Sequence, residues 1–137
     1  MSQTSIPPEQ RLIVALDVPS ATEARALVTE IGDAVNFYKV GLELFTGADG
    51  FGIVDWLTGQ KKNVFVDLKF FDVPATVGRA VSQLQGRGIT FATVHGNDAM
   101  MKAAAEAADG VGILAVTVLT SLDKADMLDL GFDCDIP

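Results

Sequence analysis

The fold is decided by the stretch Val64-Phe65-Val66-Asp67-Leu68-Lys69-Phe70-Phe71-Asp72-Val73-Pro74. Its first part, Val64–Leu68, is a short apolar run of the kind that forms a buried parallel strand. Successive side chains of a strand point to opposite faces, so we expect Asp67 and Lys69 on one face. The apolar residues on either side of Asp67 should then pack against helices. Pro74 suits the first turn of a helix that follows.

The same alternation of strand and helix extends along the whole chain. Strands are predicted at Leu12–Leu16, Phe37–Val40, Val64–Leu68, Thr90–Val94 and Gly112–Val118. Helices are predicted from a capping box at Ser20 and Glu23 to a stop at Gly32, over Gly50–Thr58, from Pro74, from Asn97 to near Gly110, and around Asp123–Leu130. Such βα alternation indicates a parallel sheet covered by helices, and therefore the α/β class.

Two α/β architectures compete for this pattern. The length of 137 residues suits an open, flavodoxin-like sheet. However, the predicted strands end on or carry polar residues, namely Asp17, Lys39, Asp67 with Lys69, His95 and Thr117. In a (β/α)8 barrel a single site is built from the carboxyl ends of several strands. We therefore expect the TIM (β/α)8-barrel family, here about the first five βα units, as a single domain over residues 1–137 with a polar N-terminal arm at 1–10.

Composition excludes several classes of function. The hydrophobic fraction is 49% and the formal net charge is −8, which is typical of a folded protein and argues against nucleic acid or an anionic membrane as partner. The single cysteine, Cys134, cannot form an internal disulfide. No apolar run reaches the roughly 20 residues of a membrane helix, and the N-terminus does not resemble a signal peptide. A cytoplasmic protein is expected.

Asp67 and Lys69 are the strongest candidates for chemistry. A lysine held among carboxylates stays protonated, so it can stabilise a developing negative charge or deliver a proton to a carbanion. The alternative is a buried ion pair that only fixes the strand. Lys39 and Asp17 carry the same argument more weakly, as charges in apolar strands.

Other polar residues have structural alternatives. Asp72 could cap the helix that begins at Pro74, and Ser121 could be the N-cap of the last helix. A histidine at a strand end, such as His95, is as often a structural group as a catalyst. Thr120 has no stronger claim than Ser121. With one His and one Cys, the sequence offers no zinc-type ligand set, and no metal or cofactor is expected.

Several motifs together resemble the orotidine 5′-monophosphate decarboxylase family. They are Ala15-Leu16-Asp17, Tyr38-Lys39-Val40-Gly41, Asp67-Leu68-Lys69-Phe70-Phe71-Asp72-Val73-Pro74-Ala75-Thr76, Val94-His95-Gly96 and Val116-Thr117-Val118-Leu119-Thr120-Ser121. The resemblance covers the chain from about Leu12 onward. It implies a homodimeric (β/α)8 barrel with a shared active site, which converts the small-molecule substrate orotidine 5′-phosphate to UMP and CO2 without a cofactor.

The resemblance also implies roles for individual residues. Asp67 would face the leaving carboxylate, and Lys69 would protonate the C6 carbanion. Asp72 and Thr76 would reach the neighbouring subunit's site. Lys39 and Asp17 would hold the ribose hydroxyls, Ser121 or Thr120 would contact the pyrimidine edge, and His95 is a further candidate for substrate binding.

Strands six to eight of the barrel have no counterpart in the sequence, so we expect a truncated chain with little or no activity alone. A sugar-phosphate decarboxylase or hexulose-phosphate synthase of the same superfamily remains an alternative, which shares the strand-three motif but uses magnesium. A receiver-like signalling domain is an alternative from another class. That alternative leaves the two strand lysines, Lys39 and Lys69, unexplained. A catalytically dead fragment that only associates with itself or with the missing half of the barrel is a third alternative.

Overall fold

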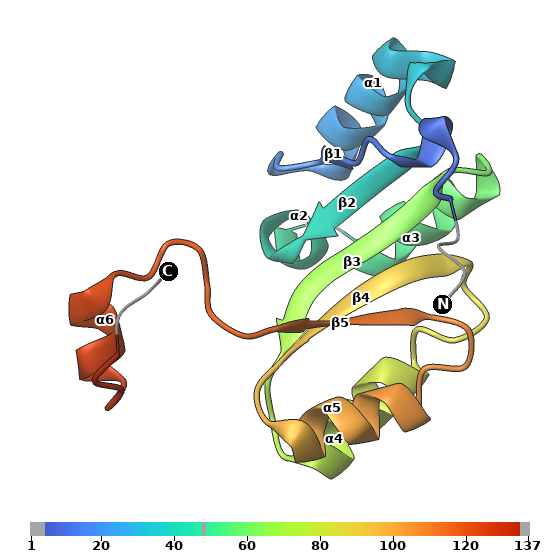
Figure 1. Cartoon of the computed structure of the whole chain (residues 1–137). Helices are drawn as coiled ribbons and strands as arrows, with labels where there is room; N and C mark the ends of the chain where they lie inside the picture. The colour runs from blue at the N-terminus through green and yellow to red at the C-terminus, as the bar shows by residue number, and fades with distance from the viewer. Residues whose placement is uncertain (1–4, 48, 135–137) are drawn as a thin grey trace.

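A computed structural model describes residues 5–47 and 49–134 of the chain. Within them, five parallel strands form one sheet, whose strands are labelled in Figure 1. The strands are β1 (Val14–Ala15), β2 (Phe37–Gly41), β3 (Asn63–Phe70), β4 (Ile89–His95) and β5 (Gly112–Val116). Their order in the sheet is β1-β2-β3-β4-β5, the same as their order in the chain. Every pairing is parallel.

This strand order decides between the two architectures. An open doubly wound sheet, as in flavodoxin-like and receiver domains, reverses direction at a switch point, giving an order such as 2-1-3-4-5. A barrel instead adds each strand beside the one before it, with right-handed crossovers that leave the helices on one side. The observed order is that of the first five strands of a (β/α)8 barrel, as predicted.

The helices fall largely where the sequence places them. They are α1 (Ala21–Ile31), α2 (Leu42–Gly47), α3 (Gly50–Gly59), α4 (Pro74–Ser82), α5 (Asp98–Glu106) and α6 (Lys124–Asp129), with short 3-10 turns at Pro8–Gln10 and Gly32–Ala34. The Ser20 side chain caps α1 by accepting from the Glu23 N–H, and Asn97 caps α5 through the Met100 N–H. Pro74 occupies the first turn of α4, as predicted. Helix α2 was not predicted.

Three local predictions are corrected. The first strand covers only Val14–Ala15 rather than Leu12–Leu16, since it pairs on one side only and leaves Leu12 59% exposed. Strand β5 ends at Val116 rather than Val118, and it is an edge strand with exposed residues rather than a buried one. The last helix is capped by Asp123 through a capping box, so Ser121 is not its N-cap. The first four residues of the expected polar arm lie outside the described residues.

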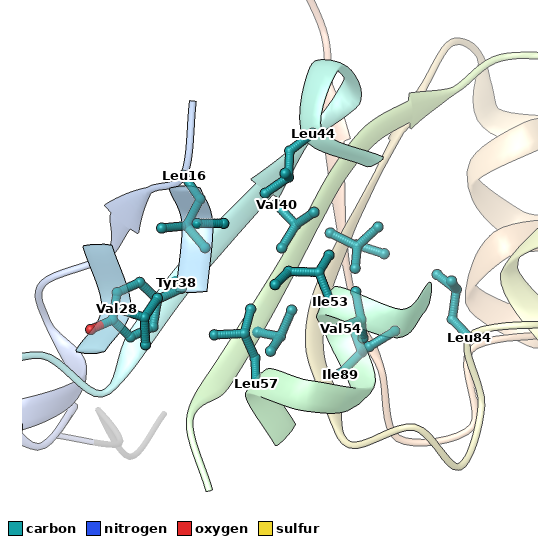
Figure 2. Packing of buried hydrophobic residues seen from close by; sticks show 14 of the residues in the cluster. Leu16, Val28, Tyr38, Val40, Leu44, Ile53, Val54, Leu57, Leu84 and Ile89 are labelled. Carbon is teal, nitrogen blue, oxygen red and sulfur yellow. The ribbon is translucent and has the colours of Figure 1, made fainter. Parts of the chain in front are cut away.

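The core lies between the sheet and the helices that cover it (Figure 2). Leu16 just after β1, Tyr38 of β2, Val66 of β3, and Ile53 and Leu57 of α3 are fully buried in one cluster. A second, smaller cluster joins α4 and α5 to β4. Helix α6 lies apart from the sheet at the end of the chain that follows β5 (Figure 1). Among the described residues, no helix has the length and apolar character to cross a membrane.

Candidate active site

Four charged side chains alternate in sign along the carboxyl ends of β1, β2 and β3. The Lys39 Nζ donates to Asp17 Oδ1 at 3.0 Å and lies 3.8 Å from Asp67 Oδ2. The Lys69 Nζ donates to Asp67 Oδ1 at 2.8 Å. Asp67, with 15% of its side chain exposed, is the most buried member, whereas Asp17 is 66% exposed. We call Asp17, Lys39, Asp67 and Lys69 the charge row.

Gly41, at the end of β2, leaves room for this row. A Cβ on that glycine would lie 3.1 Å from the Lys39 Nζ and 3.6 Å from Asp17 Oδ1. Any larger residue would therefore push against the Lys39 ammonium at the point where it meets Asp17. The close approach gives a physical reason for glycine beside the lysine strand.

Strand β3 departs from regular pairing where the charge row meets it. Val66 pairs with Ala92 and Phe70 pairs with Val94, so four steps along β3 correspond to two steps along β4. Within this bulge Lys69 has φ of 49°, a left-handed conformation that L residues other than glycine rarely adopt. The Asp67–Lys69 contact was predicted, but it is made across a bulge rather than by regular alternation. Val66 is buried, as expected, and Leu68 packs partly buried on the main core.

Thr93 of β4 lies opposite the bulge and joins Asp67 to Lys69. Its Oγ1 accepts from the Lys69 backbone N–H at 2.9 Å and donates to Asp67 Oδ1 at 2.8 Å. The sequence analysis missed this residue because threonine is common in strands. A signal was present, since Thr93 stands two residues before His95 and shares its strand face.

The environment of Asp67 keeps its carboxyl group ionised. Burial alone would raise the pKa of Asp67, but hydrogen bonds from Lys69 and Thr93 and the positive charges of Lys69 and Lys39 together bring it below the usual aspartate value. Around neutral pH the row therefore presents a carboxylate between two lysines. This arrangement can hold an anionic or hydroxyl-bearing ligand and can supply a proton from an ammonium group.

An open pocket of about 490 Å³ lies beside the row, in the size range of small-molecule sites. Asp67, Lys69 and Thr93 form its charged and polar wall, and Thr120 and Ser121 reach it from the loop after β5. Its remaining lining is largely apolar, from Phe65, Val116, Val118 and Leu119. The structure thus brings Asp67 and Lys69 of the charge row together with Thr120 and Ser121 of the loop after β5.

Asp72 and Thr76 stand apart from the charge row. Asp72 is exposed, and its Oδ1 accepts from the Val73 N–H at 2.6 Å. Helix α4 takes Val73 as its N-cap without a side-chain bond, so the alternative of Asp72 as the cap is wrong. Thr76 Oγ1 accepts from Arg79 at 3.1 Å on the same helix. Within the described residues, neither contacts Asp67 or Lys69 by a hydrogen bond or ion pair.

His95 ends β4 beside this region, as predicted. Its Nδ1 is buried and has no hydrogen-bond partner among the described residues. The ring packs edge-on against Phe71, with the ring centroids 5.6 Å apart. Within the described residues, no group of three or more His, Cys, Asp or Glu side chains is placed to hold a metal ion.

The family model for orotidine 5′-phosphate decarboxylase / HUMPS matches residues 10–133. The chain belongs to this family. A relative from Methylococcus capsulatus, named orotidine 5′-phosphate decarboxylase, is 63% identical over 136 residues, which are 99% of this chain and 56% of that protein. A relative of the same name from Bradyrhizobium is 50% identical over 94% of this chain and 54% of its own length.

A solved structure agrees with these sequence relatives. The crystal structure of orotidine 5′-phosphate decarboxylase from Lactobacillus acidophilus superposes with a TM-score of 0.78 at 38% identity, covering 93% of this chain and 61% of that one. The chain thus spans about half the length of the curated relatives it matches. Membership of the orotidine 5′-phosphate decarboxylase / HUMPS family agrees with the order of the five strands and with the resemblance drawn from the motifs.

Proposed function

We propose that this chain carries the charged part of an active site that decarboxylates orotidine 5′-phosphate to UMP. The observation that carries the proposal is the charge row, with contacts of 3.0, 3.8 and 2.8 Å that join three strands at one rim of the sheet. Ion pairs of this kind contribute little to stability when partly buried, so their placement beside a pocket favours chemistry.

The proposed reaction follows from the charges of Asp67 and Lys69. The bond between C6 and the carboxylate carbon breaks, carbon dioxide leaves, and the electron pair stays on C6. The Lys69 ammonium stabilises this carbanion and then transfers a proton to C6, which forms the new C–H bond of UMP. Solvent returns the proton to Lys69. No oxidant, reductant or cofactor is needed to balance the step.

The remaining residues have supporting roles in the proposal. Asp67 lies where the substrate carboxylate would leave, and the Lys39–Asp17 pair offers a donor and an acceptor for the ribose hydroxyls. Thr120 and Ser121 line the pocket and present hydroxyls to the pyrimidine edge. His95 stays a candidate for substrate contact, because its unpartnered Nδ1 can still take a hydrogen bond.

A homodimer with a shared site is part of the same proposal. Asp72 lies between two exposed apolar side chains, Phe71 at 68% and Val73 at 63% exposure. Exposed apolar groups that flank a charge are typical of a surface that a partner covers. In the dimer, Asp72 and Thr76 would reach the partner's pocket. Size-exclusion chromatography with light scattering should show a dimer, and a Phe71→Ser variant should shift it toward monomer.

The experiment on activity uses a chimera, in which this chain replaces the matching part of the Methylococcus capsulatus relative. We expect the chimera to decarboxylate orotidine 5′-phosphate without added metal and the 137-residue chain alone to show little or no turnover. Lys69→Met in the chimera should lower kcat by roughly 100-fold to 10,000-fold, the usual contribution of a general acid. Lys102→Met is the matched control, since that lysine is 78% exposed and lies on α5.

Two results would contradict the proposal. One is a folded chimera that binds no nucleotide and has no decarboxylase activity. The other is metal-dependent turnover of a sugar phosphate with no inhibition by a barbiturate ribotide, which would favour the sugar-phosphate branch of the family instead. Equal losses in Lys69→Met and Lys102→Met would remove Lys69 from the mechanism.

A further inference from the structure

Thr93 is the one buried polar side chain among the described residues, with 4% of its surface exposed. Both hydrogen bonds of its hydroxyl end on the charge row rather than on the strand that carries it. The Lys69 N–H can only donate, and the ionised Asp67 carboxylate can only accept. The Thr93 hydroxyl must therefore point its proton at Asp67 and its lone pair at Lys69.

The Thr93 hydroxyl accepts from a backbone N–H of β3, that of Lys69, which in a regular ladder would donate to a backbone carbonyl of the neighbouring strand. Lys69 lies inside the bulge between the Val66–Ala92 and Phe70–Val94 pairs, where the regular ladder is interrupted. Its φ of 49° lies in the left-handed region, which residues other than glycine rarely adopt, so the surroundings must hold it there. Thr93 does so by binding the Lys69 N–H at 2.9 Å.

We propose that Thr93 is a positioning residue: its hydroxyl fixes the Lys69 backbone and the Asp67 carboxylate relative to each other, and thereby places the Lys69 ammonium at the pocket wall. The geometric part of this proposal concerns the chain by itself. Its kinetic consequence rests on the proposed decarboxylase function.

The alternative is that Thr93 only satisfies buried polar groups and stabilises the fold. Thr93→Val separates the two roles, because valine keeps the shape of the side chain and removes the hydroxyl. Thr93→Ser is the conservative variant, which keeps the hydroxyl and loses a methyl group. Thr90→Val, at the other end of β4, is the matched control for a threonine-to-valine change in this strand.

The first experiment uses the 137-residue chain and needs no activity. The Asp67 carboxyl is titrated by NMR, with Asp67→Asn to assign its signal, and hydrogen exchange is followed at the Lys69 N–H. Asp67 faces Lys69 of its own strand, Lys39 of β2 with Asp17 beyond it, and Thr93 of β4. These charges are unchanged in Thr93→Val, so any change in the two readouts comes from the lost hydroxyl. We expect the pKa of Asp67 to rise and hydrogen exchange at the Lys69 N–H to become at least about tenfold faster. Thr93→Ser should keep both properties near wild type.

The second experiment measures kcat and KM in the chimera. Misplacing a reacting group by about 1 Å can cost roughly 100-fold in rate, so Thr93→Val should lower kcat by about that factor and change KM less. Thr93→Ser should recover most of the activity, and Thr90→Val should leave it unchanged. An inactive wild-type chimera would overturn the decarboxylase proposal, while the titration and exchange data would still decide the positioning role.

Wild-type values of the Asp67 pKa, of Lys69 exchange and of kcat in Thr93→Val would overturn the inference. So would equal losses in Thr93→Val and Thr93→Ser, since the methyl group would then matter rather than the hydroxyl. If Thr93→Val does not fold, Thr93→Ala replaces it in the same comparison with Thr93→Ser. Failure of both hydroxyl-free variants to fold would assign Thr93 to stability and overturn the positioning role.

Discussion

Lys62 offers the sharpest test of how the sheet is held together at the end opposite the charge row. Its ammonium donates to Gly32 O at 2.8 Å, Val35 O at 3.0 Å and Asn36 Oδ1 at 3.1 Å, and only 9% of its side chain is exposed. These bonds tie the residue just before β3 to the segment between α1 and β2. We predict that Lys62→Met, which keeps the length of the side chain, destabilises the chain.

The magnitude follows from two opposing effects. Each hydrogen bond from a charged donor contributes about 1.5 to 3 kcal/mol, and the Gly32 and Val35 carbonyls lose their Lys62 partner in the variant. Removing the ammonium also removes the cost of its burial, which is several kcal/mol for an ion in a dry site and less in this partly buried one. Asp33 adds little, because it is fully exposed. The net loss is about 2 to 3 kcal/mol.

Urea unfolding at pH 7 measures this loss, followed by circular dichroism and by the fluorescence of Trp56, the chain's single tryptophan. With a slope of about 2 kcal/mol/M, the midpoint should fall by about 1 M or slightly more. Lys61→Met is the control, because Lys61 is adjacent and exposed and should change stability by less than about 0.5 kcal/mol. Equal midpoints for the two variants would refute the assigned role of the three hydrogen bonds.

Two further predictions concern the charge row. Gly41→Ala should lower kcat of the chimera by more than about tenfold, since its Cβ would lie 3.1 Å from the Lys39 Nζ, whereas Gly59→Ala, with nothing within 4 Å, should leave the rate unchanged. The folded-state pKa of Asp67 is lowered, so its ionisation stabilises the fold above the ordinary aspartate pKa of about 4 and the benefit is lost as pH falls below it. The difference in unfolding free energy between wild type and Asp67→Asn, measured in urea from pH 7 to pH 3, should therefore shrink below about pH 4. A difference that stays constant over that range would contradict the assigned pKa shift.

The meeting of Asp17, Lys39 and Asp67 could be predicted because the carboxyl ends of parallel strands share one edge of a sheet. A charge in an apolar strand is visible in the sequence, and the strand direction then places it. The strand order was also within reach, since polar residues at successive strand ends favour a barrel. Neither inference needs the exact bounds of a strand, which explains why both survive the errors at β1 and β5.

The bulge in β3 could not be predicted in the same way. The sequence Val66-Asp67-Leu68-Lys69 alternates regularly, and nothing in it marks a left-handed residue at Lys69. The bulge depends on a hydroxyl from the neighbouring strand, which is a contact between residues far apart in the chain. Helix α2 was missed for a simpler reason, because this six-residue helix, Leu42–Gly47, has no capping signal in its sequence.

The two lysines near the ends of β3, Lys62 and Lys69, have different roles, one in stability and the other in the proposed chemistry. Lys62, the residue just before β3, is nearly buried, and its ammonium donates to carbonyl and amide oxygens of the segment between α1 and β2. Lys69, at the carboxyl end of the same strand, is 36% exposed, and its ammonium rests on a carboxylate at the pocket wall. Both ends of β3 have a non-glycine residue in the left-handed region, Lys61 with φ of 58° just before Lys62 and Lys69 with φ of 49°. A left-handed residue therefore does not distinguish the two ends of β3. The partner of each ammonium does: backbone and amide oxygens hold Lys62 in a structural role, whereas the Asp67 carboxylate holds Lys69 at the pocket wall, where its proton can serve the chemistry.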